Sequence, residues 1–243
     1  MIAGVPQSAV VVILLVVLLG AFVQSAVGLG LGMVVTPVVA MSEPDLVPTL
    51  PLLLMLPVAA VVLLREHPHL NRQVLGWTLA TRVPGTLLGA WLLTVLSTRA
   101  LGVAIALLVL AGVWIAVSQL EVPHTPPVLV SAGLLAGTGG TVAAIDGPPL
   151  VVLLADRSPG ESRATMSCYF LIGGLISLGW LGLQGQFPRA SMELFAWCLP
   201  VVAVAMLLGT VAGSRLPRET FRRGVLALCA VSALLLLVRS VIG

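Results

Sequence analysis

Apolar runs separated by short polar turns occupy nearly the whole chain. The runs cover residues 7–41, 46–64, 73–96, 100–119, 126–155, 164–184, 190–214 and 224–242. Several of them reach or exceed the roughly 20 apolar residues that a helix needs to cross about 30 Å of hydrocarbon. A membrane β-barrel would instead show alternating segments of about 10 residues. The pattern therefore predicts an all-α integral membrane protein with several crossings.

Two of the runs carry glycine and proline clusters in their interior. The run 7–41 would be about 52 Å long as one helix, which is more than a single crossing needs. It contains GLGLG at 28–32 and then Pro37, and the run 126–155 contains GTGG at 137–140 and then DGPP at 146–149. Because such clusters interrupt helices, each run is predicted to form a broken helix or a re-entrant hairpin.

The interruptions belong to an internal repeat. Gly28 and Gly140 lie 112 residues apart, as do Pro37 and Pro149, and LLGAW at 87 returns 120 residues later as LLGTV. The matches occur in the same order in both halves. The sequence therefore predicts two repeats within one transmembrane domain, residues 1–120 and 121–243, each with a broken helix or hairpin followed by three transmembrane helices.

Arginine placement tests the topology, because cytoplasmic loops are enriched in basic residues. Suppose that the runs 7–41 and 126–155 are hairpins, each of which enters and leaves the membrane on the same face, and that the N-terminus is outside. Eight arginines then lie in the cytoplasm and three outside. The cytoplasmic set is Arg65, Arg72, Arg157, Arg163, Arg215, Arg218, Arg222 and Arg223, and the outer set is Arg99, Arg189 and Arg239. Eight simple crossings give at best seven against four. Two short crossings in place of each hairpin give the same sidedness, so that alternative stays open.

This topology also predicts the orientation of the halves. Three crossings after each hairpin are an odd number, so the second repeat is inverted relative to the first. Both termini are then expected on the outer side of the membrane.

Composition restricts the function to the membrane part. The chain is 59% hydrophobic and 9% charged, and its polar connections are shorter than ten residues, which leaves no soluble domain. The basic residues are scattered without interleaved aromatics, which argues against nucleic-acid binding. The three cysteines each lie in an apolar run without CxxC spacing, so no disulfide, metal or cofactor site is predicted.

Inverted repeats with interrupted helices are typical of secondary transporters. Non-helical backbone is tolerated at membrane depth only where protein or a water-filled cavity satisfies its polar groups. The N-terminal ends of half-helices favour anions there, because their free N–H groups and the helix dipole are positive. We therefore expect the two glycine-rich breaks to approach each other and to line a central cavity.

Two stretches resemble a known family. AFVQSAVGLGLGMVVTPVVAM in the first half and SAGLLAGTGGTVAAIDGPPLVVLLAD in the second are similar to the glycine-rich signatures of the TauE/SafE sulfite exporter family, also called the toluene sulfonate uptake permease family. The resemblance spans the chain. It implies an inverted-repeat permease of the bacterial inner membrane, with both termini on the periplasmic side, for sulfur-containing anions such as sulfite, thiosulfate and organosulfonates. Asp146 stands where relatives with the GPP motif often carry a small residue.

Arg82 is the strongest candidate for binding the substrate charge. It lies about nine residues into its apolar run, near the predicted bilayer midplane, where an arginine costs at least ~2.5–3.5 kcal/mol on the insertion scale. Such residues usually face a cavity or a counter-ion. The alternatives are a shifted segment that lets Arg82 reach the interface, and a purely structural ion pair.

Asp146 is the natural partner of Arg82 or a proton carrier. A carboxyl group in a low-dielectric pocket favours its protonated form unless a cation lies close by, which suits proton coupling. The alternative is an aspartate that binds the backbone of the DGPP break.

Neutral groups around the breaks complete the predicted substrate site. The glycines permit positive φ angles and close approach, and nearby hydroxyl and amide groups offer hydrogen bonds, unless they bond back to their own helices. Cys168 is either near the path or a small buried hydrophobe. The predicted set is Gln24, Ser25, Gly28, Gly30, Gly32, Thr36, Thr138, Gly139, Gly140, Thr141 and Cys168, with Gly137 for close approach.

Other functional classes have weaker support. A hydrolase is disfavoured because GxSxG is absent and no histidine falls within an apolar run, so the protein is not expected to be an enzyme. A passive anion channel would use the same groups, and a structural subunit would not require Arg82 or Asp146 at depth. The sequence therefore predicts a permease that moves a small sulfur-bearing anion by alternating access, with protons as a possible coupling ion.

Overall fold

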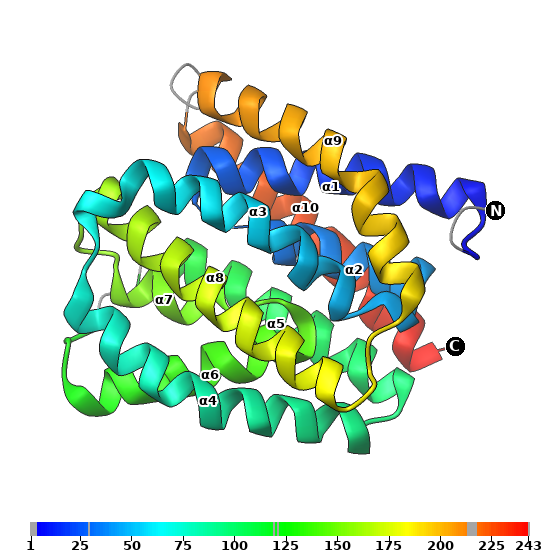
Figure 1. The fold of residues 1–243 in the computed structure, drawn as a ribbon, viewed down its shortest axis with the longest axis horizontal. Coiled ribbons are helices and arrows are strands. Elements are labelled where there is room, and N and C mark those ends of the chain that lie inside the picture. Colours follow the sequence, from blue (N-terminus) through cyan, green and yellow to red (C-terminus); the bar gives the residue numbers. More distant parts are fainter. Residues whose placement is uncertain (1–3, 29, 119, 121, 213–217, 243) are drawn as a thin grey trace.

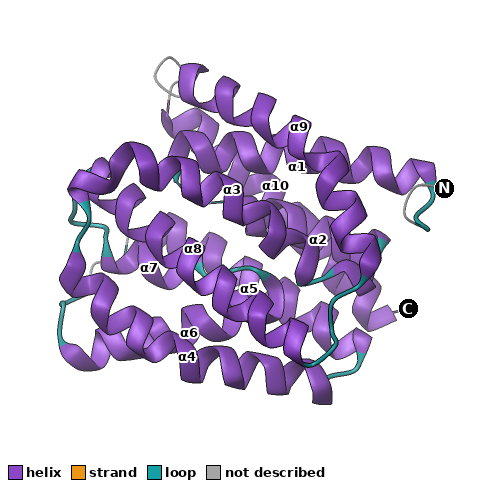
Figure 2. Ribbon diagram, viewed as in Figure 1, coloured by secondary structure: helices purple, strands orange, loops and turns teal. Residues whose placement is uncertain are grey.

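The computed structural model describes residues 4–28, 30–118, 120, 122–212 and 218–242 (Figure 1). Within these ranges the protein consists of ten α-helices, two short 3-10 helices and no extended strand (Figure 2). The first half contains α1 (Gln7–Val27), α2 (Leu31–Ser42), η1 (Pro44–Leu46), α3 (Thr49–Glu66), η2 (His67–His69), α4 (Arg72–Val95) and α5 (Thr98–Ser118). The second contains α6 (Pro126–Ala143), α7 (Gly147–Leu153), α8 (Pro159–Leu183), α9 (Arg189–Ala212) and α10 (Arg218–Ile242). The all-α prediction is confirmed.

Seven of the described helices are long and apolar enough to cross a membrane. They are α1, α3, α5, α6, α8, α9 and α10. Helix α4 is not among the seven, although its 24 residues would span about 36 Å. Arg82, Thr78 and Thr86 make its sequence less apolar, and all three side chains are buried. The chain is therefore a multi-pass membrane protein.

The first break returns the chain along the helix that precedes it. Gly28 and Gly30 have φ angles of 93° and 129°, which glycine adopts without steric cost. A methyl group at Gly20 would lie 2.9 Å from Val35, so α2 packs back against α1. The 12 residues of α2 span only about 18 Å. A full-length helix followed by a short returning helix favours the hairpin over two crossings.

The second break lies later in the sequence than its glycines predict. Helix α6 continues through Gly137, Gly139 and Gly140, and the chain turns at Ala144, whose φ angle is 55°. The GTGG segment therefore does not interrupt the helix. Its glycines serve close packing instead: a methyl group at Gly137 would lie 2.8 Å from the carbonyl oxygen of Arg82.

The two breaks contact each other, as expected from the sequence. A methyl group at Gly32 in α2 would overlap the carbonyl oxygen of Ala144. The Thr36 hydroxyl donates a hydrogen bond of 2.7 Å to the carbonyl of Ala143. These contacts let backbone from residues more than one hundred positions apart share one buried junction.

Helix contacts follow the order of the two halves. Helix α1 packs against α9, and α6 packs against α4; likewise α2 packs against α10, and α7 against α5. Helices α3 and α8 pack together, as do α5 and α10. Each of these six contacts therefore has a counterpart when α1–α5 are matched to α6–α10. The repeat boundary at residue 120 and the inversion of the repeats stay predictions.

Glycines let α4 and α6 approach closely. Methyl groups at Gly85 and Gly89 would lie 2.5 Å and 2.8 Å from carbonyl oxygens of α6. Gly209 makes the corresponding approach of α9 to α1, 2.7 Å from the carbonyl oxygen of Phe22. Gly85 and Gly89 are spaced as GxxxG, and so are Gly209 and Gly213, a spacing that predicts close helix contacts in membranes. Gly213 lies outside the described residues.

Candidate functional site

A buried ion pair lies at the centre of α4. Arg82 Nη1 donates to Asp146 Oδ2 over 2.9 Å, and the two side chains are 0% and 1% exposed. Arg82 comes from the middle of α4, and Asp146 is the residue before α7. Arg82 therefore does not extend to the protein surface. The structure brings the two leading candidates together, and their role in substrate binding stays a prediction.

Helix α8 supplies the wall around the guanidinium group. The Arg82 Cζ atom lies 4.6 Å from the centroid of the Tyr169 ring, within cation–π range. Arg82 Nη2 lies 3.4 Å from the Ser177 hydroxyl, which in turn bonds Thr141 over 2.8 Å. The Tyr169 hydroxyl donates to the carbonyl of Gly133 over 3.1 Å. The arginine is thus held by an aromatic face, a carboxylate and a hydroxyl pair.

Tyr169 and Ser177 are site residues that the sequence pattern alone did not predict. Their spacing could have indicated a shared helix face, because Tyr169, Gly173 and Ser177 lie at positions i, i+4 and i+8. A methyl group at Gly173 would overlap Nε and Cζ of Arg82. Gly140 is close on the other side, where a methyl group would lie 3.0 Å from both Arg82 and Asp146.

We predict that Gly173→Ala displaces the Arg82 guanidinium group. Overpacking a filled interior costs about 1–3 kcal/mol, so the free energy of unfolding and the transport rate should both fall. The matched control is Gly179→Ala on the same helix, where an added methyl group meets no atom within 4 Å. Thermal unfolding and transport measurements on both variants check this, and equal behaviour of the two would contradict the packing described.

The ion pair leaves polar atoms without partners. Among the described residues, Arg82 Nε, Asp146 Oδ1 and Thr86 Oγ1 are buried and make no hydrogen bond. Thr86 lies one helical turn after Arg82 on α4. Buried polar groups are rarely left unpaired, so these atoms give the pair an unused capacity to donate and accept hydrogen bonds.

The predicted polar residues of the first break bind backbone instead. Gln24 Oε1 accepts from the Leu31 N–H over 3.1 Å, and its Nε2 donates to the Gly28 carbonyl over 3.1 Å. Ser25 donates to the Met206 carbonyl over 3.2 Å. In this conformation both side chains stabilise the break and its contact with α9.

Of the remaining candidates, only some lie near the Arg82–Asp146 pair. Thr138 bonds back to the Leu134 carbonyl and across to the Gly85 carbonyl. Gly139 packs against the Ile145 carbonyl, where a methyl group would lie 2.6 Å away. Cys168 is a buried free thiol. Thr141 is the predicted hydroxyl that joins the Arg82 surroundings, through Ser177.

The half-helix ends offer fewer backbone donors than expected. Two of the first three residues of α7 are Pro148 and Pro149, which have no N–H group. At the start of α2, the Leu31 N–H is already bonded to Gln24. The charged pair, rather than a row of free amides, is therefore the main polar feature where the breaks meet.

Comparison with known proteins identifies the family. The family model described as sulfite exporter TauE/SafE matches residues 12–236, nearly the whole chain. Comparison with curated proteins and with solved structures gives no significant match. Seven apolar helices of crossing length among the described residues fit a membrane transporter. The chain belongs to the sulfite exporter TauE/SafE family.

Proposed function

We propose that the protein is a secondary transporter that moves a small sulfur-containing anion across the bacterial inner membrane by alternating access. Sulfite, thiosulfate and organosulfonates are the candidate substrates, and a proton is the proposed coupling ion. The observation that carries this proposal is the buried Arg82–Asp146 pair in a chain of a transporter family.

The pair suits an anion because only one of its partners is replaceable by substrate. Arg82 provides the buried positive charge, and Asp146 occupies one face of it. An incoming anion competes with Asp146 for the guanidinium group, and two adjacent negative charges repel. Protonation of Asp146 removes both the competition and the repulsion. We therefore propose that a proton binds Asp146 when an anion binds Arg82.

Polar contacts close the protein on one side of the Arg82–Asp146 pair, and we call the contact between Arg163 and Glu66 the latch. Arg163 at the start of α8 donates to Glu66 Oε1 at the end of α3, over 2.6 Å and 3.1 Å. Asn71 donates to Glu161 over 2.7 Å. A methyl group at Gly28 would lie 2.7 Å from Arg163 Cγ, so the latch also covers the first break.

Apolar side chains support closure at the other end. Leu52 and Leu53 of α3 form a buried cluster with Leu178 and Leu181 of α8 and with Ala144. Arg82 contacts α8 between these leucines and the latch. The sequence leads us to expect an open cavity, whereas both charged side chains are inaccessible to solvent. A conformation closed at both ends fits an alternating-access cycle.

Flux measurements in proteoliposomes test this function. With labelled thiosulfate or sulfite and an imposed pH gradient, the proposal predicts saturable accumulation above equilibrium. Collapsing the gradient with a protonophore should remove the accumulation but leave exchange of labelled for unlabelled anion. Strictly downhill, unsaturable flux would indicate a channel and contradict the proposal.

A further inference from the structure

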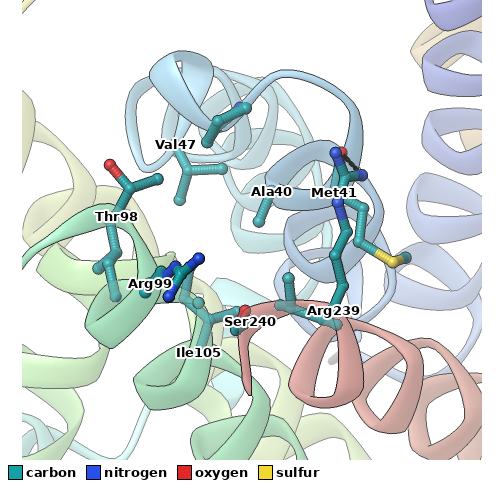
Figure 3. A pocket seen from close by; sticks show the side chains of 12 residues that line it. Ala40, Met41, Val47, Thr98, Arg99, Ile105, Arg239 and Ser240 are labelled. Carbon is teal, nitrogen blue, oxygen red and sulfur yellow. Dashed lines mark hydrogen bonds between the residues drawn. The ribbon is translucent and has the colours of Figure 1, made fainter. Parts of the chain in front are cut away.

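A cavity lies between the helix ends opposite the Arg163–Glu66 latch. Its volume is about 160 Å³, and its walls come from the end of α2, the following turn, the start of α5 and the end of α10 (Figure 3). Figure 1 shows α10 ending at the same end of the molecule at which α1 begins. Arg82 is not among the lining residues, so the cavity is separate from the central pair.

Two arginines line this cavity from different helices. Arg99 extends from α5 and Arg239 from α10, with Thr98 and Ser240 beside them (Figure 3). Arg239 donates a hydrogen bond to the Met41 carbonyl, which fixes its head at the edge of the cavity. No aspartate or glutamate is among the described lining residues. The two guanidinium groups therefore place positive charge on this part of the wall, which the charge of an anion would complement.

The rest of the wall is apolar. Val47, Leu101, Ile105 and Leu236 also line the cavity, and Ile105 and Leu236 are 1% and 3% exposed. The cavity has room for several water molecules or for a small organic anion. The combination of two guanidinium groups and an apolar wall fits a charged head with a few attached carbons better than a fully hydrated inorganic ion.

We propose that this cavity binds the oxyanion head of a small organic anion, a sulfonate or a phosphate monoester or diester, through Arg99 and Arg239. Guanidinium groups match the charge of such heads, and their planar N–H groups match the spacing of the oxygens. The head has two possible sources, a soluble organosulfonate or the phosphate of a membrane lipid. The inference does not depend on the proposed role of Arg82, because the two sites share no residue.

Equilibrium binding of labelled ethanesulfonate to the purified full-length protein in lipid-free neutral detergent tests the proposal. The variant Arg99→Gln/Arg239→Gln should lose one equivalent of bound ethanesulfonate, or bind it at least tenfold more weakly there. The matched control is Arg189→Gln, an exposed arginine outside the cavity, which should bind as the unaltered protein does. A second equivalent that persists in the double variant reports on the central site, so failure of either site is seen separately.

A second experiment, with a lipid as competitor, distinguishes the two sources of the oxyanion head. If a lipid phosphate is the natural occupant, phosphatidylglycerol should displace ethanesulfonate, and native mass spectrometry should find one retained lipid that the double variant lacks. If a soluble sulfonate is the occupant, phosphatidylglycerol should not compete. Either result supports an oxyanion site. Equal binding by the unaltered protein and the folded double variant, or no binding of ethanesulfonate and phosphatidylglycerol to either, would overturn it.

Discussion

Replacing Arg82 with glutamine is expected to lower the transport rate at least about thirtyfold, because removing one partner of a buried charge pair costs about 2–5 kcal/mol and each ~1.4 kcal/mol changes a rate about tenfold. Arg82 Nη1 is bonded to Asp146, and its Nε has no partner among the described residues. Glutamine retains hydrogen-bonding capacity but not the positive charge. The rate of labelled anion uptake into proteoliposomes measures the effect.

The single substitution also leaves Asp146 buried without its cation, which destabilises a protein by about 3–5 kcal/mol. The decisive variant is therefore Arg82→Gln/Asp146→Asn, which removes both charges together. We expect it to fold and insert into the membrane better than Arg82→Gln alone, and still not to transport. Transport at the unaltered rate by the double variant would show that the pair is structural.

The second large effect is expected from Asp146→Asn. In the unaltered protein, lowering the pH protonates Asp146 and frees Arg82, so anion affinity should rise as the pH falls. Asparagine resembles the protonated acid in shape and carries no charge. The variant should therefore bind the anion tightly at every pH tested, retain exchange, and lose accumulation driven by a pH gradient.

Asp156→Asn is the matched control for this substitution. Asp156 is about half exposed and lies 3.3 Å from Arg157, away from the central pair. Its replacement should leave the pH dependence of anion binding unchanged. If Asp146→Asn keeps the full pH dependence of the unaltered protein, the coupling proton binds elsewhere.

The Arg82–Asp146 pair could be predicted from the sequence, because the cost of burying a charge in the membrane restricts where charged residues can lie. An arginine in the middle of an apolar run needs a counter-ion or a polar cavity, and Asp146 is one of few carboxylates within such a run. The first break was predictable for a related reason. Gly28 and Gly30 adopt positive φ angles that other residues rarely tolerate.

The second break could not be placed correctly from the sequence, because glycine occurs both in turns and at close contacts between helices. The GTGG segment suggests a turn, yet its glycines are helical and make room for α4 and for the break itself. The turn falls instead at Ala144, whose left-handed conformation is unusual for alanine. Only the packing of α6 against α4 distinguishes these uses.

Contacts between segments far apart in the chain also could not be predicted from the sequence alone. Glu66 and Arg163 are 97 residues apart, and their pairing depends on how α3 packs against α8. Tyr169 and Ser177 face Arg82 for the same reason. Their spacing on one helix face suggests a shared partner, but the helix that supplies it follows only from the fold.

Counting protons during anion binding tests whether Asp146 carries the coupling proton. In the proposed cycle an anion at Arg82 and a proton at Asp146 bind together. Purified protein in weakly buffered solution near neutral pH should therefore take up close to one proton for each anion bound at the central site, and Asp146→Asn should take up none. Anion binding to Arg82 without proton uptake by the unaltered protein would contradict it.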